Sequence, residues 1–149
     1  MGANGSNGKG LLEDPDKRNY TTNTAFDISA NIKVVEAKDK NAKVKLPEES
    51  HTPNHIYVAI NKPATDKIGK NDPYAGKLKS IAVYGSDCKK LYEIHVDHSH
   101  SGMSVHYHPW ENGHPVKAGT GKNAHNVAYP LTSEMKKILE QVKSKVPHV

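Results

Sequence analysis

The sequence predicts an α+β fold, in which a small twisted antiparallel β-sheet is followed by one amphipathic helix at the C-terminal end. Two observations support this fold class. Segments of alternating apolar and polar residues, separated by turn-forming residues, lie around residues 77–110 and are typical of an antiparallel meander. The end of the chain instead places apolar side chains at helical spacing.

The meander consists of three predicted strands joined by two turns. The turn residues GSDCKK and the glycine Gly102 allow the two reversals. The strands are residues 77–85 (KLKSIAVYG), 90–98 (KLYEIHVDH) and 103–110 (MSVHYHPW).

Shorter strands are predicted upstream of the meander. Ile32, Val34 and Val35 indicate one strand, and Val44 with Leu46 indicates another that ends at Pro47. Residues 55–60 (HIYVAI) are β-branched and aromatic, which favours a buried strand. The segments 62–76 and 111–130 contain several glycines and prolines and predict loops.

The segment 131–145 (LTSEMKKILEQVKSK) predicts a helix. Thr132 or Ser133 can cap its N-terminus, and a glutamate follows in the first turn. A stripe of apolar side chains recurs at positions i, i+3, i+4 and i+7, which indicates one face packed on the core. The stripe consists of Met135, Ile138, Leu139 and Val142.

Length and composition favour one small basic domain. The 149 residues fit a single domain, which we expect at 21–149 after a flexible polar leader at 1–20. Only 35% of residues are apolar, so the core is expected to be small. The formal net charge of +5 favours an anionic partner such as nucleic acid or an acidic protein.

The sequence disfavours a membrane-spanning helix, a secretory signal and an internal disulfide. No apolar run approaches the ~20 residues that a membrane-spanning helix needs. The first residues (MGANGSNGKGLLEDPDKR) lack the apolar stretch of a secretory signal. The single cysteine, Cys88, cannot form an internal disulfide, and we expect it to be chemically inert in a turn.

Histidine is the most informative residue type in this chain. Seven of the ten histidines lie between positions 95 and 125, and five lie within fourteen residues. Because strand side chains alternate between faces, His95, Asp97, His106 and His108 are predicted to share one polar face of the paired second and third strands. His98 falls on the other face if the strand continues, and in the turn if it has ended.

Paired imidazoles suit the cleavage of RNA by proton transfer. One neutral histidine removes the proton from the ribose 2′-hydroxyl, and a protonated one donates to the leaving oxygen. Lysines stabilise charge on the phosphoryl group, and aromatic rings stack unpaired bases. The catalytic candidates are His95, Asp97, His98, His106 and His108. The substrate-binding candidates are Lys89, Lys90, Tyr107, Trp110, Lys117 and Lys122.

The same histidines also form metal-ligand patterns. His98 with His100 and His106 with His108 make two H-x-H pairs, which place two ligands on one side of a strand. The alternative ligands of a zinc or other divalent ion are therefore His98, His100, His106 and His108. Asp97-His98 with a later Asn126 and a terminal helix is also similar to a metal-dependent HNH nuclease, although the spacing is poor.

Residues 81–110 contain, in order, a strand, a charged turn, a strand ending in Asp-His, and a block rich in Pro, His and Trp. The matching sequence is IAVYGSDCKKLYEIHVDHSH, followed by VHYHPW. From Lys79 to His108 it resembles the C-terminal toxin domains of bacterial polymorphic and contact-dependent growth inhibition systems. The resemblance implies an RNase of the barnase-like and colicin-like group, often acting on tRNA without a metal cofactor. It also implies a neutralising immunity protein, which we expect to be acidic because this chain is basic.

The resemblance implies, further, a monomeric toxin domain, secreted or delivered as part of a larger bacterial protein, which acts in the cytoplasm of the target cell. No residue role follows from it, so the roles given above come from acid–base chemistry. Two alternatives remain open: a metal-dependent nuclease, and a non-catalytic histidine-rich binding module. The histidines expected to be structural or on the surface are His51, His55, His114 and His125.

Overall fold

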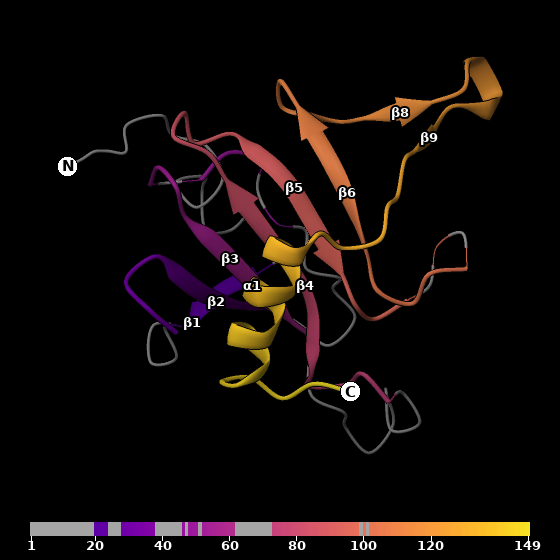
Figure 1. Cartoon of the computed structure of the whole chain (residues 1–149). Helices are drawn as coiled ribbons and strands as arrows, with labels where there is room; N and C mark the ends of the chain where they lie inside the picture. The colour runs from indigo at the N-terminus through magenta and orange to yellow at the C-terminus, as the bar shows by residue number, and fades with distance from the viewer. Residues whose placement is uncertain are drawn as a thin grey trace.

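The computed structural model describes residues 20–23, 28–37, 46, 48–50, 52–61, 73–98, 100 and 102–149 (Figure 1). Within these residues the α+β class is confirmed: a seven-stranded sheet, in the order β1 to β7, carries one C-terminal helix. The sheet strands are β1 (Tyr20–Asn23), β2 (Ile32–Ala37), β3 (Ile56–Ile60), β4 (Leu78–Tyr84), β5 (Lys90–His95), β6 (His106–Glu111) and β7 (His114–Pro115). The helix is α1 (Ser133–Lys143).

All neighbouring strands are antiparallel except β2 and β3, which run parallel. The predicted meander is present as β4, β5 and β6. The strands expected near Ile32 and at 55–60 are present as β2 and β3. Leu46 is buried but lies outside a strand, and its expected partner Val44 lies outside the described residues, as does the leader up to residue 19.

Two predicted strand boundaries and one predicted loop differ from the structure. Strand β5 ends at His95 instead of position 98, where the Asp97 side chain bonds to the His98 ring and so favours a bend over the strand ladder. Strand β6 begins at His106 instead of Met103, because Met103 pairs with His100 across a reversal at Gly102, whose φ is 81°. The predicted loop 111–130 contains short paired strands.

The helix α1 begins where the sequence places it. Thr132 is the N-cap, and its hydroxyl accepts a hydrogen bond from the Met135 backbone nitrogen at 3.2 Å. Met135, Leu139 and Val142 are buried, so the expected apolar stripe is confirmed as core. Figure 1 shows α1 lying across the sheet in front of β3 and β4.

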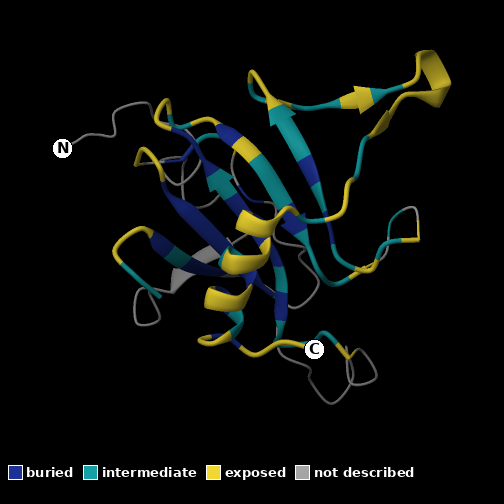
Figure 2. Ribbon diagram, viewed as in Figure 1, coloured by how far each residue is buried: buried dark blue, intermediate teal, exposed yellow. Residues whose placement is uncertain are grey.

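The sheet therefore has two different faces. The face beneath α1 is the main core, where Val58, Ile81 and Ile94 pack with the helix. The opposite face carries a second cluster around Tyr57, Ala82 and Tyr84. Strand β3 is buried along its whole length, because it contributes to both clusters (Figure 2).

A small two-stranded hairpin extends from the sheet beyond β7. It contains β8 (Lys117–Ala118), the 3-10 helix η4 (Gly121–Asn123) and β9 (His125–Asn126), and we call residues 117–126 the arm. Its residues are exposed or half-buried, and Figure 2 shows it projecting away from the sheet. At its base, Val127 donates a backbone hydrogen bond to Val116 at 3.1 Å.

Candidate functional site

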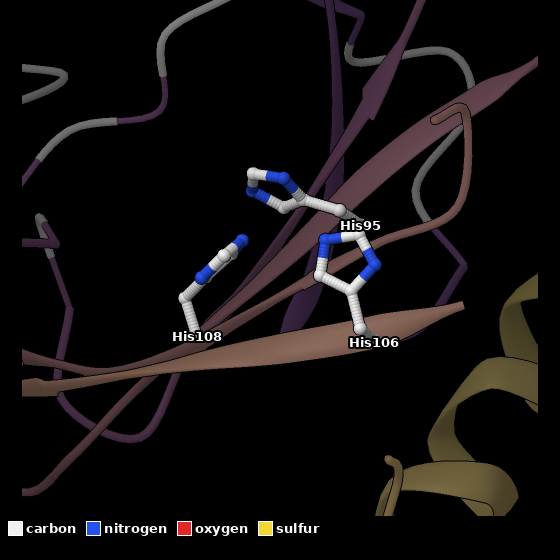
Figure 3. Close-up of side chains that lie close together, drawn as sticks. All are labelled: His95, His106 and His108. Carbon is white, nitrogen blue, oxygen red and sulfur yellow. The ribbon is translucent and has the colours of Figure 1, made fainter. Parts of the chain in front are cut away.

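The pairing of β5 with β6 brings three histidines together on the face opposite α1. In the register of the two strands, His95 lies directly across from His106, and Glu93 lies directly across from His108. Side chains two residues apart on a strand share a face, so His106 and His108 project from β6 on the same side. Figure 3 shows the rings of His95, His106 and His108 turned toward one another. The prediction that these three share a face is confirmed.

Two further histidines come from the segment that connects β5 to β6. The ring centroid of His98 lies 5.0 Å from that of His95 and 5.3 Å from that of His106. The ring of His100 lies 5.6 Å from His106 and 5.2 Å from His108. The segment reverses at Gly102, where His100 and Met103 form an antiparallel bridge. We call the five residues His95, His98, His100, His106 and His108 the histidine cluster.

His106 is the central member of the cluster and its most unusual residue. Its side chain is completely buried, and among the described residues neither ring nitrogen has a hydrogen-bond partner. A buried polar atom without a partner costs roughly 1–3 kcal/mol, so such atoms require an explanation. One nitrogen from each of His95, His106 and His108 lies within 4.8 Å of the other two, which is a grouping able to hold a metal ion.

Three of the other members of the histidine cluster have an acceptor that fixes the orientation of the ring. The Nε2 atom of His95 lies 2.9 Å from a carboxylate oxygen of Glu93. The Nδ1 atom of His98 lies 2.8 Å from the carboxylate of Asp97. The Nδ1 atom of His108 lies 2.8 Å from the Val127 carbonyl oxygen. Because an oxygen of this kind only accepts, the facing nitrogen carries the proton and the other nitrogen keeps its lone pair.

Asp97 lies beside the cluster rather than within it. Its second carboxylate oxygen accepts a hydrogen bond from the Asn61 amide at 3.3 Å, so Asp97 links His98 to the end of β3. Asp97 was expected to share the face of His95 as a strand residue. The structure instead places it past the end of β5, where it contacts the cluster through His98.

Lys90 was expected at the phosphate of a substrate, and the structure places its ammonium in a buried ion pair with Glu93. Tyr84 pairs with Lys90 and Val83 with Tyr92, so Leu91 is an extra residue that forms a bulge. The bulge turns Lys90 to the same face as Glu93, where its ammonium bonds to the Glu93 carboxylate at 2.6 Å. The Lys90 side chain is only 2% exposed, and it lies 4.1 Å from the centre of the Trp110 ring.

The pKa values follow from burial and from these contacts. Burial, together with the neighbouring imidazoles, lowers the pKa of His106 to about 4. Burial also lowers the pKa of His108, although its hydrogen bond to Val127 opposes the shift. Burial alone would raise the pKa of Glu93, but its bonds with His95 and Lys90 lower it to about 2. At neutral pH, His106 therefore has a free lone pair and Glu93 is charged.

The remaining predicted substrate-binding residues lie in different places. Tyr107 lies on the opposite face, where its ring packs 5.9 Å from Tyr92 and 5.7 Å from Tyr129, so the structure does not bring it to the histidine cluster. Trp110 is half-buried and is covered by Lys90. Exposed lysines remain as candidates for contacts with an anionic partner. They are Lys89, in the turn before β5, and Lys117 and Lys122 on the arm.

The residue that sequence reasoning missed is Glu93. Its signal was present in the sequence, since Glu93 stands two positions before His95 and therefore shares its face of the strand. The histidines expected to be structural or on the surface mostly behave so. His55 is buried beside Tyr57, and His114 and His125 are exposed. His51 lies outside the described residues.

No protein-family model, curated protein sequence or solved structure matches this chain at a significant level. Within the described residues, no helix has the length and apolar character needed to cross a membrane, in agreement with the sequence.

Proposed function

We propose that this chain is a metal-dependent nuclease whose ion is bound by His95, His106 and His108. The observation that supports this most strongly is the pair of unpartnered nitrogens on the buried His106 ring. A metal ion would give one of these nitrogens a partner in place of a hydrogen bond. The fixed orientations of His95 and His108, each with one nitrogen bonded to an oxygen, are those of metal-binding histidines in general.

The donor set indicates the kind of metal. Imidazole nitrogens suit zinc, copper, nickel and iron, whereas magnesium and calcium prefer oxygen. Because zinc–nitrogen bonds are about 2.0–2.1 Å long, two nitrogens on one tetrahedral ion lie about 3.3 Å apart. The three nitrogens already lie within 4.8 Å of one another, so the rings need only a small inward movement to bind one ion. Zinc is the first ion to test.

Three protein ligands leave a coordination position for water. A zinc-bound water has a pKa of about 7, which makes hydroxide available at neutral pH. His98 and His100 come from the connecting segment rather than from a strand, and the His98 side chain is 49% exposed. This exposed side of the cluster is where we place the entry of water and of the scissile bond.

The proposed substrate is RNA, with tRNA as a class to test. The formal net charge of +5 favours a polyanion. Between residues 112 and 133 the sequence has two lysines and two histidines but no aspartate or glutamate, so the arm is cationic. Val127, which directly follows the arm, accepts the hydrogen bond from the His108 ring. Lys117 and Lys122 therefore lie on the segment that leads to the site, where they can bind backbone phosphates of the RNA.

The test is cleavage of total RNA by the chelator-treated chain, with zinc, manganese or magnesium added back. We expect cleavage to disappear with the metal and to return with zinc. The variant His106→Leu should be inactive with every ion, while His114→Leu, at an exposed position outside the cluster, should keep activity. Undiminished cleavage by protein verified to be metal-free would refute the proposal. Tight zinc binding without cleavage of RNA or DNA would leave a non-catalytic binding module.

A second candidate is the metal-free acid–base RNase that the sequence favours first. One observation supports it: His95 Nδ1 and His98 Nε2 lie 3.3 Å apart, and each ring is hydrogen-bonded to its own carboxylate. Such a pair can divide the roles of base and acid between two imidazoles. This candidate requires activity that survives chelation, and a 2′,3′-cyclic phosphate at the cut end. We rank it second because it gives the buried His106 nitrogens no role.

Both candidates fit a bacterial toxin domain with an acidic immunity protein. Expression of the chain inside bacterial cells should then arrest growth, and His106→Leu should relieve the arrest. An acidic protein encoded next to this chain should bind it and restore growth. Normal growth at a verified level of soluble wild-type protein would count against the toxin proposal, whatever the cluster binds.

A further inference from the structure

We infer that Glu93 is a positioning residue of the proposed metal centre, which holds the His95 ring so that its Nδ1 atom faces the ion. This inference rests on the proposed metal site. It adds a specific claim: the binding atom of His95 is Nδ1, and it is selected by a carboxylate that does not itself touch the metal.

The hydrogen bonds divide the Glu93 carboxylate between two partners. One oxygen lies 2.9 Å from His95 Nε2, and the other accepts from the Lys90 ammonium at 2.6 Å. The acceptor oxygen requires the proton of His95 to sit on Nε2, which leaves the Nδ1 lone pair free. That Nδ1 atom lies 3.3 Å from Nε2 of His98, another member of the histidine cluster.

Lys90 holds Glu93 in this orientation. Its side chain is 2% exposed and is enclosed by the Trp110 ring at 4.1 Å and by the Leu46 carbonyl oxygen at 3.4 Å. A buried ion pair is weak evidence for stability, because desolvation offsets most of the attraction. The pair of Lys90 and Glu93 also contacts His95 of the cluster. A carboxylate partner orients a metal-binding imidazole and increases its affinity for the ion.

The position of Glu93 in the sheet supports the same role. Glu93 lies across from His108 in the register of β5 and β6, next to the pair formed by His95 and His106. Its carboxylate therefore lies on the same face as all three proposed ligands. Its bond to Lys90 occupies one oxygen, which favours a supporting role for Glu93 over direct binding of the ion.

The test measures cobalt(II) binding, with its absorption spectrum, by the chelator-treated wild type, Glu93→Gln and Glu111→Gln. Glutamine keeps the shape and an acceptor oxygen but removes the charge. We expect Glu93→Gln to keep a wild-type visible spectrum at saturation while its dissociation constant rises about 10- to 100-fold. Glu111→Gln, which changes an exposed glutamate at the end of β6, should bind cobalt as the wild type does. Equal affinities of Glu93→Gln and the wild type would refute the inference.

A second measurement needs no variant. Nitrogen-15 NMR of the wild-type histidines reports which ring nitrogen carries the proton and which one shifts when zinc is added. For His95 we expect the proton on Nε2 and the zinc-induced shift on Nδ1. A zinc-induced shift on Nε2 would overturn the inference while leaving the metal site intact. If no histidine shifts and cobalt does not bind the wild type, the proposed function itself fails.

Discussion

At the scale of single residues, His106 has the properties of a functional residue that lowers the stability of the folded chain. Its two buried nitrogens without partners each reduce stability in the absence of a metal. We therefore predict that His106→Leu stabilises the chelator-treated protein by roughly 1–3 kcal/mol, because an apolar side chain has no nitrogens to leave unsatisfied. The same change should abolish zinc binding.

Urea unfolding in chelator and zinc titration check this prediction together. His114→Leu, at an exposed position, serves as the control for the substitution itself. A His106→Leu protein that is markedly less stable than the wild type in chelator would mean that the ring is held by packing that leucine cannot replace. The apparent lack of a partner for His106 would then carry no functional meaning.

The pair of Lys90 and Glu93 gives a second prediction at this scale. Removing one partner leaves the other charge buried, so Lys90→Met is expected to lower the free energy of unfolding by about 3–5 kcal/mol. Adding Glu93→Gln to Lys90→Met removes the orphaned charge and should recover part of that loss. The double-mutant cycle is measured by urea unfolding at neutral pH, and a strictly additive result would contradict the coupling.

The site residues differ in how far the sequence could predict them. Strand alternation was enough to group His95, His106 and His108, because the faces of a regular strand are fixed by its period. Lys90 could not be placed, because the bulge at Leu91 turns its side chain to the other face, and alternation alone does not reveal a bulge. His98 could not be placed either, since its position depends on where β5 ends.

At the scale of secondary-structure elements, the arm extends the site toward a partner. It lacks acidic residues and carries Lys117 and Lys122, both exposed. We predict that Lys117→Ala and Lys122→Ala each weaken RNA binding uniformly across sequences. Each variant should also lose one phosphate contact. The slope of log affinity against log salt concentration should therefore become shallower by roughly 0.7 for single-stranded RNA.

The measurement is RNA binding by the inactive His106→Leu protein at several salt concentrations, so that cleavage does not interfere. Lys136→Ala, an exposed lysine on α1, is the matched control and should leave the slope unchanged, because α1 lies on the other face of the sheet. Equal slopes for the arm variants and the control would show that the arm does not contact the phosphates.

The elements themselves were predictable where local sequence determines them. Helix α1 has a cap, a charged first turn and an apolar stripe, and all three act within a few residues of each other. The parallel pairing of β2 with β3 was not predictable, because it depends on contacts between segments far apart in the chain. The short strands of the arm escaped prediction because glycine-rich sequence at 119–121 favours a loop by composition.

At the scale of the whole molecule, metal binding and folding are expected to be coupled through His106. An ion that binds only the folded chain adds about 4.1 kcal/mol of stability at a thousandfold excess over its dissociation constant, which exceeds the roughly 1–3 kcal/mol expected from His106→Leu. Without metal, His106→Leu should be the more stable protein. With zinc in excess the wild type alone gains stability, so the order of the two proteins should reverse.

The pH dependence of stability in chelator provides the last prediction. The pKa of His106 is about 4 in the folded chain, below its ordinary value of 6.5, so between these pH values the unfolded chain binds the extra proton. Wild-type stability should therefore fall as pH decreases through this window. Glu93, with a pKa of about 2 in the folded chain against 4.5 ordinarily, adds a further loss below pH 4.5.

Replacing His106 isolates its share of this loss. His106→Leu retains Glu93 but has no imidazole to protonate at that position, so its advantage over the chelated wild type should widen as pH falls from 6.5 to 4. Urea unfolding of both proteins at three pH values in this range measures the gap. A constant gap would mean that His106 takes up its proton as easily in the folded chain as in the unfolded one, which is incompatible with a buried ring surrounded by other imidazoles.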